Sequence, residues 1–349
     1  MFFKTAFKLA RPFVFCLDAE KAHQLTIASL KMLPPAPPQK RDDVLTSSVA
    51  GIEFPNPVGL AAGFDKNGEV PYHMLGMGFG FAELGTVTPQ PQDGNPKPRI
   101  FRLTEDKAVI NRLGFNNEGQ QAVIHRMQSV STLPGVVGIN IGANKDSVDR
   151  IDDYAQGVRN MLPFARYLTV NISSPNTVGL RALQDKAALT ELIDAVMRAR
   201  GESNCPVFLK VAPDLEPADI EDISAIAAES KLDALIVSNT TISRPELKSR
   251  HANETGGLSG APLHDLALQR IRDFRKATSG NIPLIAVGGI SSGEQAYARI
   301  RAGASLVQLY SAMVYEGPLL AKTIAKDLKR RLIADGFANV NEAIGVDKN

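Results

Sequence analysis

Amide and hydroxyl side chains are concentrated in one short stretch, residues 171–177, which reads Asn-Ile-Ser-Ser-Pro-Asn-Thr. It follows an apolar run at 167–170 that is typical of a buried parallel strand. Pro175 has a fixed φ angle and favours an extended conformation at Ser174, so the side chains point in defined directions. By itself the stretch fits an ordinary polar loop as well as a functional site. The rest of the chain repeats the order strand, polar loop, helix, which favours the functional site.

Asparagines stand at several other ends of apolar runs, and together these are Asn111, Asn140, Asn171, Asn176 and Asn239. An amide offers both a donor and an acceptor and carries no charge, so converging amides suit a neutral heterocycle such as a pyrimidine or a flavin ring. A metal site would need clustered His, Asp, Glu or Cys, and the sequence shows no such cluster. The five scattered histidines indicate no Ser/His/Asp set. No GxxxxGK[ST] motif occurs, and Gly76-Met-Gly-Phe-Gly80 lacks the GxGxxG spacing.

Two further features concern anions. The last two apolar runs are followed by Gly288-Gly289 and by Tyr310-Ser311, and glycines at such a place leave backbone N–H groups free to bind phosphate. Lys66 and Lys210 stand at the ends of other runs. Because a buried lysine needs an anionic partner, each is a candidate for binding an anion or a reduced cofactor; a solvated lysine is the alternative.

The elements that must position these residues alternate from residue 50 onward. Eight apolar runs are predicted to be strands: 58–63, 79–87, 136–142, 167–173, 207–212, 234–239, 283–289 and 306–310. Helical periodicity follows each of them, at 68–76, 117–131, 148–161, 185–201, 216–229, 262–278, 292–302 and 318–334. This pattern predicts an α/β fold, a (β/α)8 TIM barrel with its chemistry at the carboxyl ends of the strands. A doubly wound open sheet is the alternative.

The first forty residues differ from the rest. Apolar residues at helical spacing predict a helix within 1–17 that Pro12 breaks into a short helix and a turn, and Asp18 is the predicted N-cap of a second helix. The second helix runs to about residue 33, before the proline-rich spacer 34–38. A basic amphipathic helix pair can lie on an anionic membrane or simply pack on the main domain, and the pattern favours neither.

Length and composition define the class of protein. The 349 residues, 44% hydrophobic and 22% charged, are typical of a globular chain and exclude wholesale disorder. The pattern of elements predicts an N-terminal helical extension and linker at 1–40 and a barrel domain at 41–349, with a small hairpin inserted at 99–111. A net charge of +2 gives no signal of nucleic-acid binding. Cys16 and Cys205 are isolated, which fits a reducing compartment. No apolar run approaches the roughly 18 residues that cross a bilayer, and no secretory signal is evident.

Six motifs in combination resemble the dihydroorotate dehydrogenase family over residues 1–335. They are Ala-Ala-Gly-Phe-Asp-Lys-Asn-Gly (61–68), Glu-Leu-Gly-Thr-Val-Thr-Pro (83–89), Asn-Arg-Leu-Gly-Phe-Asn-Asn (111–117), the 171–177 stretch, Gly-Gly-Leu-Ser-Gly (256–260) and Val-Gly-Gly-Ile (287–290). The fumarate- or NAD-linked class of that family has a cysteine as catalytic base and lacks N-terminal helices, whereas this chain has Ser174 and the helices. It is therefore similar to the quinone-dependent, membrane-associated class. The sixth strand ends in Ser-Asn-Thr-Thr where the family often has Thr first, and a hydroxyl is kept.

The resemblance implies that FMN lies across the barrel mouth and that (S)-dihydroorotate, stacked on it, is oxidised to orotate in de novo pyrimidine biosynthesis. The implied cofactor contacts are Ala62, Gly63, Phe64, Asp65, Lys66, Thr86, Asn140, Asn171, Lys210, Ser238, Gly260, Gly289, Tyr310 and Ser311. The implied substrate contacts are Lys66, Asn111, Arg112, Leu113, Gly114, Phe115, Asn171, Asn176, Asn239 and Thr240.

The resemblance also implies individual roles. Ser174 is the implied base that removes the C5 proton while C6 delivers a hydride to the flavin; because an unassisted serine is a poor base, Thr177 and an ordered water are the expected proton path. Lys66 faces the substrate carboxylate, and Lys210 stabilises the anionic reduced flavin.

In the same class the N-terminal helices form an apolar tunnel through which a membrane quinone, ubiquinone or menaquinone, reaches the flavin. The implied polar positions of the tunnel are His23, Arg102 and Tyr310; from the pattern alone His23 would be structural or solvated. Arg102 stands between Phe101 and Leu103 and needs a partner for its charge. We expect a monomer bound peripherally to the cytoplasmic side of a bacterial inner membrane, with no nucleic-acid partner.

Other functions stay open on the residues alone. A dihydrouridine oxidoreductase would need a basic tRNA-binding region, and a dihydropyrimidine oxidoreductase would need iron–sulfur cysteines; neither is evident. A phosphate-binding aldolase or isomerase barrel is a non-redox alternative that a colourless protein would indicate. A non-catalytic scaffold is the fourth, and so many polar groups at one barrel face argue against it.

Overall fold

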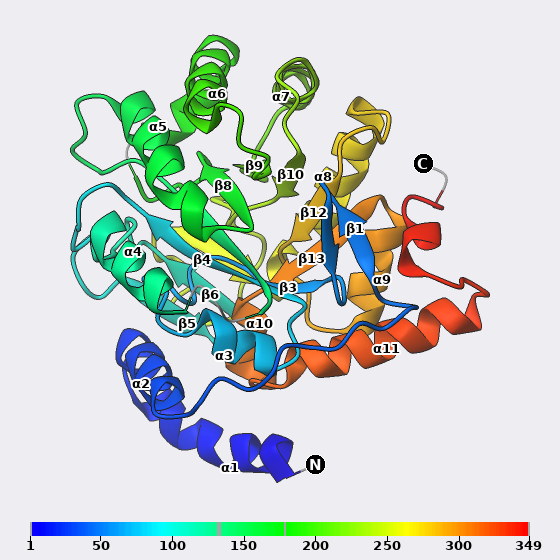
Figure 1. The fold of residues 1–349 in the computed structure, drawn as a ribbon. Coiled ribbons are helices and arrows are strands. Elements are labelled where there is room, and N and C mark those ends of the chain that lie inside the picture. The colour runs from blue at the N-terminus through cyan, green and yellow to red at the C-terminus, as the bar shows by residue number, and fades with distance from the viewer. Residues whose placement is uncertain (1, 131–133, 178, 348–349) are drawn as a thin grey trace.

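The computed structural model of the chain describes residues 2–130, 134–177 and 179–347. Within these residues eight parallel strands close into a barrel in the order β10-β12-β13-β3-β4-β7-β8-β9 (Figure 1). Their bounds are β3 (Val58–Leu60), β4 (Phe81–Val87), β7 (Val136–Ile141), β8 (Tyr167–Asn171), β9 (Val207–Val211), β10 (Ala234–Val237), β12 (Leu284–Val287) and β13 (Ala304–Leu309). The predicted strands and their closure are confirmed, and the open-sheet alternative is wrong.

Helices surround the barrel and cover the outer faces of its strands (Figure 1). They are α3 (Pro71–Gly76), α4 (Gly119–Val130), α5 (Arg150–Met161), α6 (Lys186–Arg200), α7 (Pro217–Glu229), α8 (His264–Ala277), α9 (Gly293–Arg301), α10 (Ser311–Glu316) and α11 (Leu320–Ala334). Short 3₁₀ helices span Leu162–Phe164, Leu180–Gln184, Ala261–Leu263 and Val340–Ala343. All predicted barrel helices are present, α10 was missed, and the predicted helix end at residue 131 lies outside the described residues.

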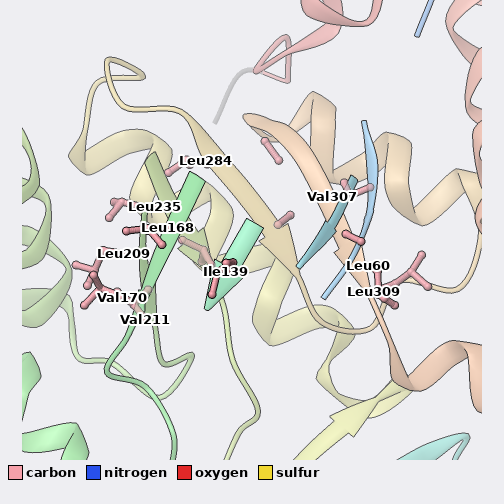
Figure 2. Packing of buried hydrophobic residues seen from close by; sticks show 14 of the residues in the cluster. Leu60, Ile139, Leu168, Val170, Leu209, Val211, Leu235, Leu284, Val307 and Leu309 are labelled. Carbon is pink, nitrogen blue, oxygen red and sulfur yellow. The ribbon is translucent and has the colours of Figure 1, made fainter. Parts of the chain in front are cut away.

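Alternation along each strand divides the barrel residues into two sets, because successive side chains of a strand point to opposite faces. Leu168 and Val170 of β8 and Leu209 and Val211 of β9 belong to the cluster that packs beneath the helices (Figure 2). The residues between them point into the barrel. The inward set forms an apolar layer at the amino ends of the strands, which contains Phe81, Tyr167, Phe208, Ile236, Ile285 and Leu306.

A short antiparallel hairpin covers the apolar end of the barrel interior. It consists of β1 (Ser47–Val49) and β2 (Ile52–Phe54), and Phe54 meets Phe81 with the ring centroids 5.0 Å apart. Above this layer the inward positions become polar, and they include Glu83, Asn140, Thr169, Lys210 and Gln308, all buried. The change from apolar to polar along the barrel axis places the polar groups beneath the carboxyl ends of the strands.

The N-terminal helices α1 (Phe2–Cys16) and α2 (Ala19–Lys31) form a hairpin at the side of the barrel (Figure 1). Asp18 caps α2 as predicted, since its carboxylate accepts from the backbone N–H groups of Glu20 and Lys21. The predicted break at Pro12 is wrong, because α1 continues through it. Proline removes one helical hydrogen bond and crowds the preceding turn, but Arg11 and Arg102 hold the C-terminal half of α1 by bonds to backbone carbonyls across the interface. The predicted start at Met1 lies outside the described residues.

The inserted hairpin is confirmed as β5 (Ile100–Leu103) and β6 (Ala108–Asn111). The sequence analysis missed a third antiparallel strand, β11 (Gly257–Gly260), which pairs with β6 from nearly 150 residues away in the chain. Its two glycines give no strand signal, so only the tertiary pairing defines it. Across the described residues, none of the helices is both long and apolar enough to cross a bilayer.

Candidate functional site

One cavity of about 750 Å³ runs from the N-terminal helix hairpin to the carboxyl ends of the barrel strands. It contains all but four of the residues that the sequence analysis singled out. The predicted residues in its wall are His23, Ala62, Gly63, Phe64, Lys66, Thr86, Arg102, Asn111, Leu113, Gly114, Phe115, Asn171, Ser174, Asn176, Lys210, Ser238, Asn239, Thr240, Gly260, Gly289, Tyr310 and Ser311. The strand ends and the helix hairpin therefore enclose one continuous space.

Ser174 lies in the loop after β8 and faces this cavity, with 6% of its surface exposed. Its Oγ accepts from the backbone N–H of Asn176 at 3.3 Å. The side-chain amide of Asn176 donates in turn to Asn111 Oδ1 at 3.3 Å, and the backbone carbonyl of Asn176 accepts from Asn95 Nδ2 at 3.0 Å. The loop is thus tied to β6 and to the segment before β5, so the Ser174 hydroxyl has a fixed position in the cavity wall.

Three of the five predicted amides, those of Asn140, Asn171 and Asn239, belong to one continuous hydrogen-bonded chain across the barrel mouth. Asn171 Nδ2 donates to Thr86 Oγ1 at 3.0 Å, and Thr86 Oγ1 donates to Asn140 Oδ1 at 2.6 Å. On the other side, Asn239 Nδ2 donates to Ser173 Oγ at 2.9 Å, and Ser173 Oγ donates to Asn171 Oδ1 at 2.9 Å. Side chains from four different strand ends are therefore held together by one series of hydrogen bonds.

The root of this chain is Glu83, which the sequence analysis missed. Glu83 is fully buried in the barrel interior and accepts from Asn140 Nδ2 at 2.8 Å and from Gln308 Nε2 at 2.8 Å. The hydroxyls of Tyr167 and Thr169 donate to it at 3.2 Å each. A carboxylate only accepts, so it fixes the Asn140 amide with its nitrogen inward and its oxygen toward Thr86, and this polarity continues to Asn171. The sequence did contain a signal for this role of Glu83, because a charged residue at an inward position of an apolar strand needs buried hydrogen-bonding partners.

Replacing Glu83 with Gln should lower the free energy of unfolding by about 1.5–3 kcal/mol, because four buried donors lose a charged acceptor and an amide places N–H against N–H. Urea denaturation measures the change. The matched control is Glu53→Gln on the exposed face of β2, where the partner Arg41 is also exposed and an effect within about 0.5 kcal/mol is expected. Equal effects of the two substitutions would contradict the role assigned to Glu83.

Two buried lysines supply positive charge to the cavity. Burial lowers the pKa of Lys210, and the charge of Glu83 opposes that change. Burial likewise lowers the pKa of Lys66 to about 8, partly opposed by Glu20. Neither ammonium group has a hydrogen-bonding partner among the residues that the structure describes. Both face the cavity, so an anionic ligand there would meet unpaired donors.

Four predicted residues do not line the cavity. Asp65 is buried, and its carboxylate accepts from the backbone N–H groups of Asn67, Glu69 and Val70, so it shapes the loop after β3. Arg112 points away, to Glu254 at 2.7 Å. Asn140 lies beneath the wall, between Glu83 and Thr86. Direct contacts of Asp65, Arg112 and Asn140 with a ligand therefore remain predictions.

Thr177, the fourth, is 3% exposed, and its hydroxyl has no partner among the described residues. It is three residues from Ser174 and behind the cavity wall. A buried hydroxyl without a partner is a place where a water molecule can bind. This geometry is compatible with the predicted proton path through Thr177 and a water, which remains a prediction.

The glycines at the other end of the cavity leave backbone exposed to it. Gly260 and Gly289 both have positive φ angles, +100° and +67°, which favour glycine. A Cβ on Gly289 would lie 2.5 Å from His264 Cα, so no larger residue fits. Ser311 starts α10 in the same wall, and its hydroxyl lies 2.7 Å from Ser259 Oγ. Ser259 was missed by the sequence analysis, although it lies in one of the motifs.

The predicted tunnel residues meet at the junction of the helix hairpin and the barrel. His23 Nδ1 lies 3.3 Å from the Tyr310 hydroxyl, and the His23 ring meets Phe64 edge-on at 5.4 Å. Burial, with the nearby charge of Lys66, lowers the pKa of His23 to about 3, so the ring is neutral at physiological pH. Arg102 donates to the carbonyls of Val14 and Leu17 at the end of α1, which are the partners its charge required.

A buried ion pair attaches α2 to the barrel domain and was also missed. Arg99, 6% exposed, donates from Nη2 and Nε to the two carboxylate oxygens of Glu20 at 2.6 and 3.0 Å. Arg99 further donates to the carbonyls of Asp93 and Asn95. Such a bidentate pair fixes orientation as well as distance, so it holds α2 over the cavity.

Comparison with known proteins adds the following. A family model described as dihydroorotate dehydrogenase matches residues 44–332. A Novosphingobium aromaticivorans protein named dihydroorotate dehydrogenase (quinone) is 61% identical over 98% of this chain and 99% of its own length. An Erythrobacter litoralis protein of the same name is 61% identical over 97% of this chain and 99% of its own.

Among solved structures, a dihydroorotate dehydrogenase of Eimeria tenella in complex with ferulenol superposes with a TM-score of 0.90 and 44% sequence identity. It covers 95% of this chain and 96% of its own. Its ligand-free form gives the same TM-score and identity.

Proposed function

Because the chain belongs to the dihydroorotate dehydrogenase family, in its quinone-dependent class, we propose that it oxidises (S)-dihydroorotate to orotate with FMN in the cavity, Ser174 as base and a membrane quinone as final acceptor. The observation that carries this proposal is the single cavity that joins Ser174 and the amide chain to the N-terminal helix hairpin. A dehydrogenase that uses a soluble acceptor has no need of the second half of that space.

The residues of the barrel mouth fit FMN. A Cβ added to Gly63 would meet only the Tyr310 ring, at 3.9 Å, so that this glycine leaves room for a flat ring against the wall. Lys66 and Lys210, whose ammonium groups have no hydrogen-bonding partner in the described part of the chain, face the space. Gly260, Gly289 and Ser311 offer small groups for a phosphate at its far end. When bound, FMN supplies hydride acceptance from dihydroorotate and electron transfer to quinone.

The chain's own residues bind and orient the substrate and move its proton. Ser174 holds its hydroxyl in the wall, where it takes the C5 proton of dihydroorotate, with Thr177 and a water carrying the proton onward. Asn111, Asn176 and Asn239 bind the ring amides of the substrate. Lys66 binds its carboxylate, and Lys210 keeps a positive charge at the barrel mouth.

The N-terminal hairpin delivers quinone from a membrane surface. Apolar side chains lie on its outer surface as well as toward the cavity: Leu9, Phe13 and Met32 are 70%, 77% and 85% exposed. Large exposed apolar side chains on an amphipathic hairpin are typical of an interfacial membrane contact. We therefore propose that the protein binds peripherally to the cytoplasmic side of a bacterial inner membrane; that it does so as a monomer is part of the same proposal. The redox alternatives and the aldolase or isomerase lack this support.

An absorbance spectrum of the purified protein tests the proposal. We expect flavin bands that bleach when dihydroorotate is added without oxygen and return when a short-chain ubiquinone or menaquinone is added. A colourless preparation that cannot be reconstituted with FMN would refute the cofactor, and flavin that dihydroorotate does not bleach would refute the substrate.

The affinity for orotate should fall as pH rises above about 8, because only protonated Lys66, whose pKa is about 8, attracts the carboxylate. The group is charged below this pKa and neutral above it, so binding is full at pH 7 and weakens by up to about tenfold per unit at higher pH. Orotate titrations that follow the flavin spectrum between pH 7 and 9 measure this. In Lys66→Met the affinity should be low and independent of pH; a pH-independent wild type would contradict the assignment.

A further inference from the structure

Arg299 of α9 is the largest side chain that the described structure buries completely. Only its Nη2 atom is bonded: it donates to the carbonyl oxygens of His264 at 2.7 Å and Gly288 at 3.0 Å, and it lies 3.4 Å from His264 Nδ1. Nε and Nη1 are buried and have no partner in the described part of the chain. Arg299 forms no ion pair with any described residue, and the favourable charge that acts on it is that of Asp265.

A guanidinium in this position is costly unless an anion compensates it, because burial removes its hydration. Burial lowers the pKa of Arg299 to about 10, which still leaves it protonated at neutral pH. The charge is therefore present, and no described residue forms an ion pair with it; only the more distant charge of Asp265 acts in its favour. A bound anionic ligand close to Arg299 would supply the counter-ion.

The position of Arg299 shows where such a ligand would lie. The carbonyl of Gly288 and the N–H of Gly289 belong to one peptide unit, and both glycines line the cavity. When a cation donates to the carbonyl side of a peptide, the N–H on its other side becomes a stronger donor. Within the described residues the Gly289 N–H has no acceptor. His264 Nδ1 also lies 3.1 Å from the Gly289 carbonyl, so the turn is held on both sides.

We propose that Arg299 is a positioning residue for the cofactor phosphate: it fixes and polarises the Gly288–Gly289 peptide and provides the buried positive charge behind it. The inference rests on the proposed function, since it takes the anion to be the phosphate of FMN. Arg299 does not reach the cavity wall, and it acts on the phosphate through the peptide and through its field. It has no effect on the flavin ring.

The test compares two ligands that differ only in the phosphate. Full-length protein stripped of flavin is titrated with FMN and with riboflavin, and binding is followed by flavin fluorescence. Arg299→Met should raise the Kd for FMN by roughly tenfold or more, the range for a lost charged hydrogen bond, and change that for riboflavin by about twofold at most. Arg299→Lys, which keeps the charge, should restore most of the FMN affinity.

Equal losses for FMN and riboflavin in Arg299→Met would overturn the inference and leave a purely structural role. A second measurement needs no variant: phosphorus NMR of FMN bound to the wild type should show a dianion that does not titrate down to pH 5, whereas a free phosphate has its pKa near about 6. Titration near that value would also overturn it. Wild-type protein that binds neither flavin would refute the proposed function, and the inference with it. If the wild type binds FMN tightly and Arg299→Met leaves the ratio of the Kd values for FMN and riboflavin unchanged, the inference alone is refuted.

Discussion

Ser174→Ala should slow reduction of the flavin by dihydroorotate by about 10²–10⁴-fold, the usual contribution of a positioned general base, while FMN stays bound. The hydroxyl of Ser174 faces the cavity, and its loss removes no contact to the barrel core. Stopped-flow bleaching of the flavin measures the step directly. Quinone reoxidation of the same flavin should keep its wild-type rate.

Two controls separate chemistry from structure in this variant. Flavin content and the midpoint of thermal unfolding should match the wild type, because within the described residues the Ser174 hydroxyl accepts one weak bond, from Asn176 at 3.3 Å. Ser174→Cys keeps a group that can take a proton, so it should recover part of the rate and shift the pH profile toward the pKa of a thiol. Bleaching of Ser174→Ala at the wild-type rate would remove this residue from the mechanism.

Deletion of residues 1–38 should abolish quinone reduction and leave reduction of the flavin by dihydroorotate within about threefold of wild type. The physical reason is that α1 and α2 form the outer half of the cavity, whereas Ser174 and the amide chain belong to the barrel. Anaerobic bleaching and reoxidation by a short-chain quinone measure the two half-reactions separately. Loss of both would indicate a folding role for the hairpin. The buried Glu20–Arg99 pair gives this alternative a specific cause, because the deletion removes Glu20 and leaves Arg99 without it.

A pair of point variants tests the same role without deleting any contact to the barrel. Thr26→Trp adds bulk to the cavity wall within α2, and Lys21→Trp adds the same group to the exposed surface of that helix. We expect Thr26→Trp to raise the KM for quinone strongly and Lys21→Trp to leave it unchanged. Equal behaviour of the two variants would contradict passage of quinone between the helices.

The resemblance to a family predicted most of the candidate site, and the structure gathers those residues in one space. Lys66, Ser174 and Asn239 are far apart in the chain, but each follows a strand, and the carboxyl ends of parallel strands meet at one face. Alternation of apolar runs with helical periodicity was likewise enough to predict the barrel strands. These features are local in sequence, because strand length, helix period and cap residues depend on near neighbours.

The positions that only the tertiary structure decided depend on partners distant in sequence. Pro12 does not break α1 because Arg102, which lies in β5 and is distant in sequence, bonds to the end of the helix. Glu83 became the root of the amide chain only once the strand register placed Asn140 beside it. In the sequence Arg299 is an ordinary residue of a predicted helix. Only its complete burial in the structure shows that its charge needs a compensating anion. By itself the sequence determined the eight barrel strands, the helices that follow them and the polar residues at the strand ends. The closed barrel determined which side chains share a hydrogen bond or a charge, because such energies depend on distance and burial, not on spacing along the chain.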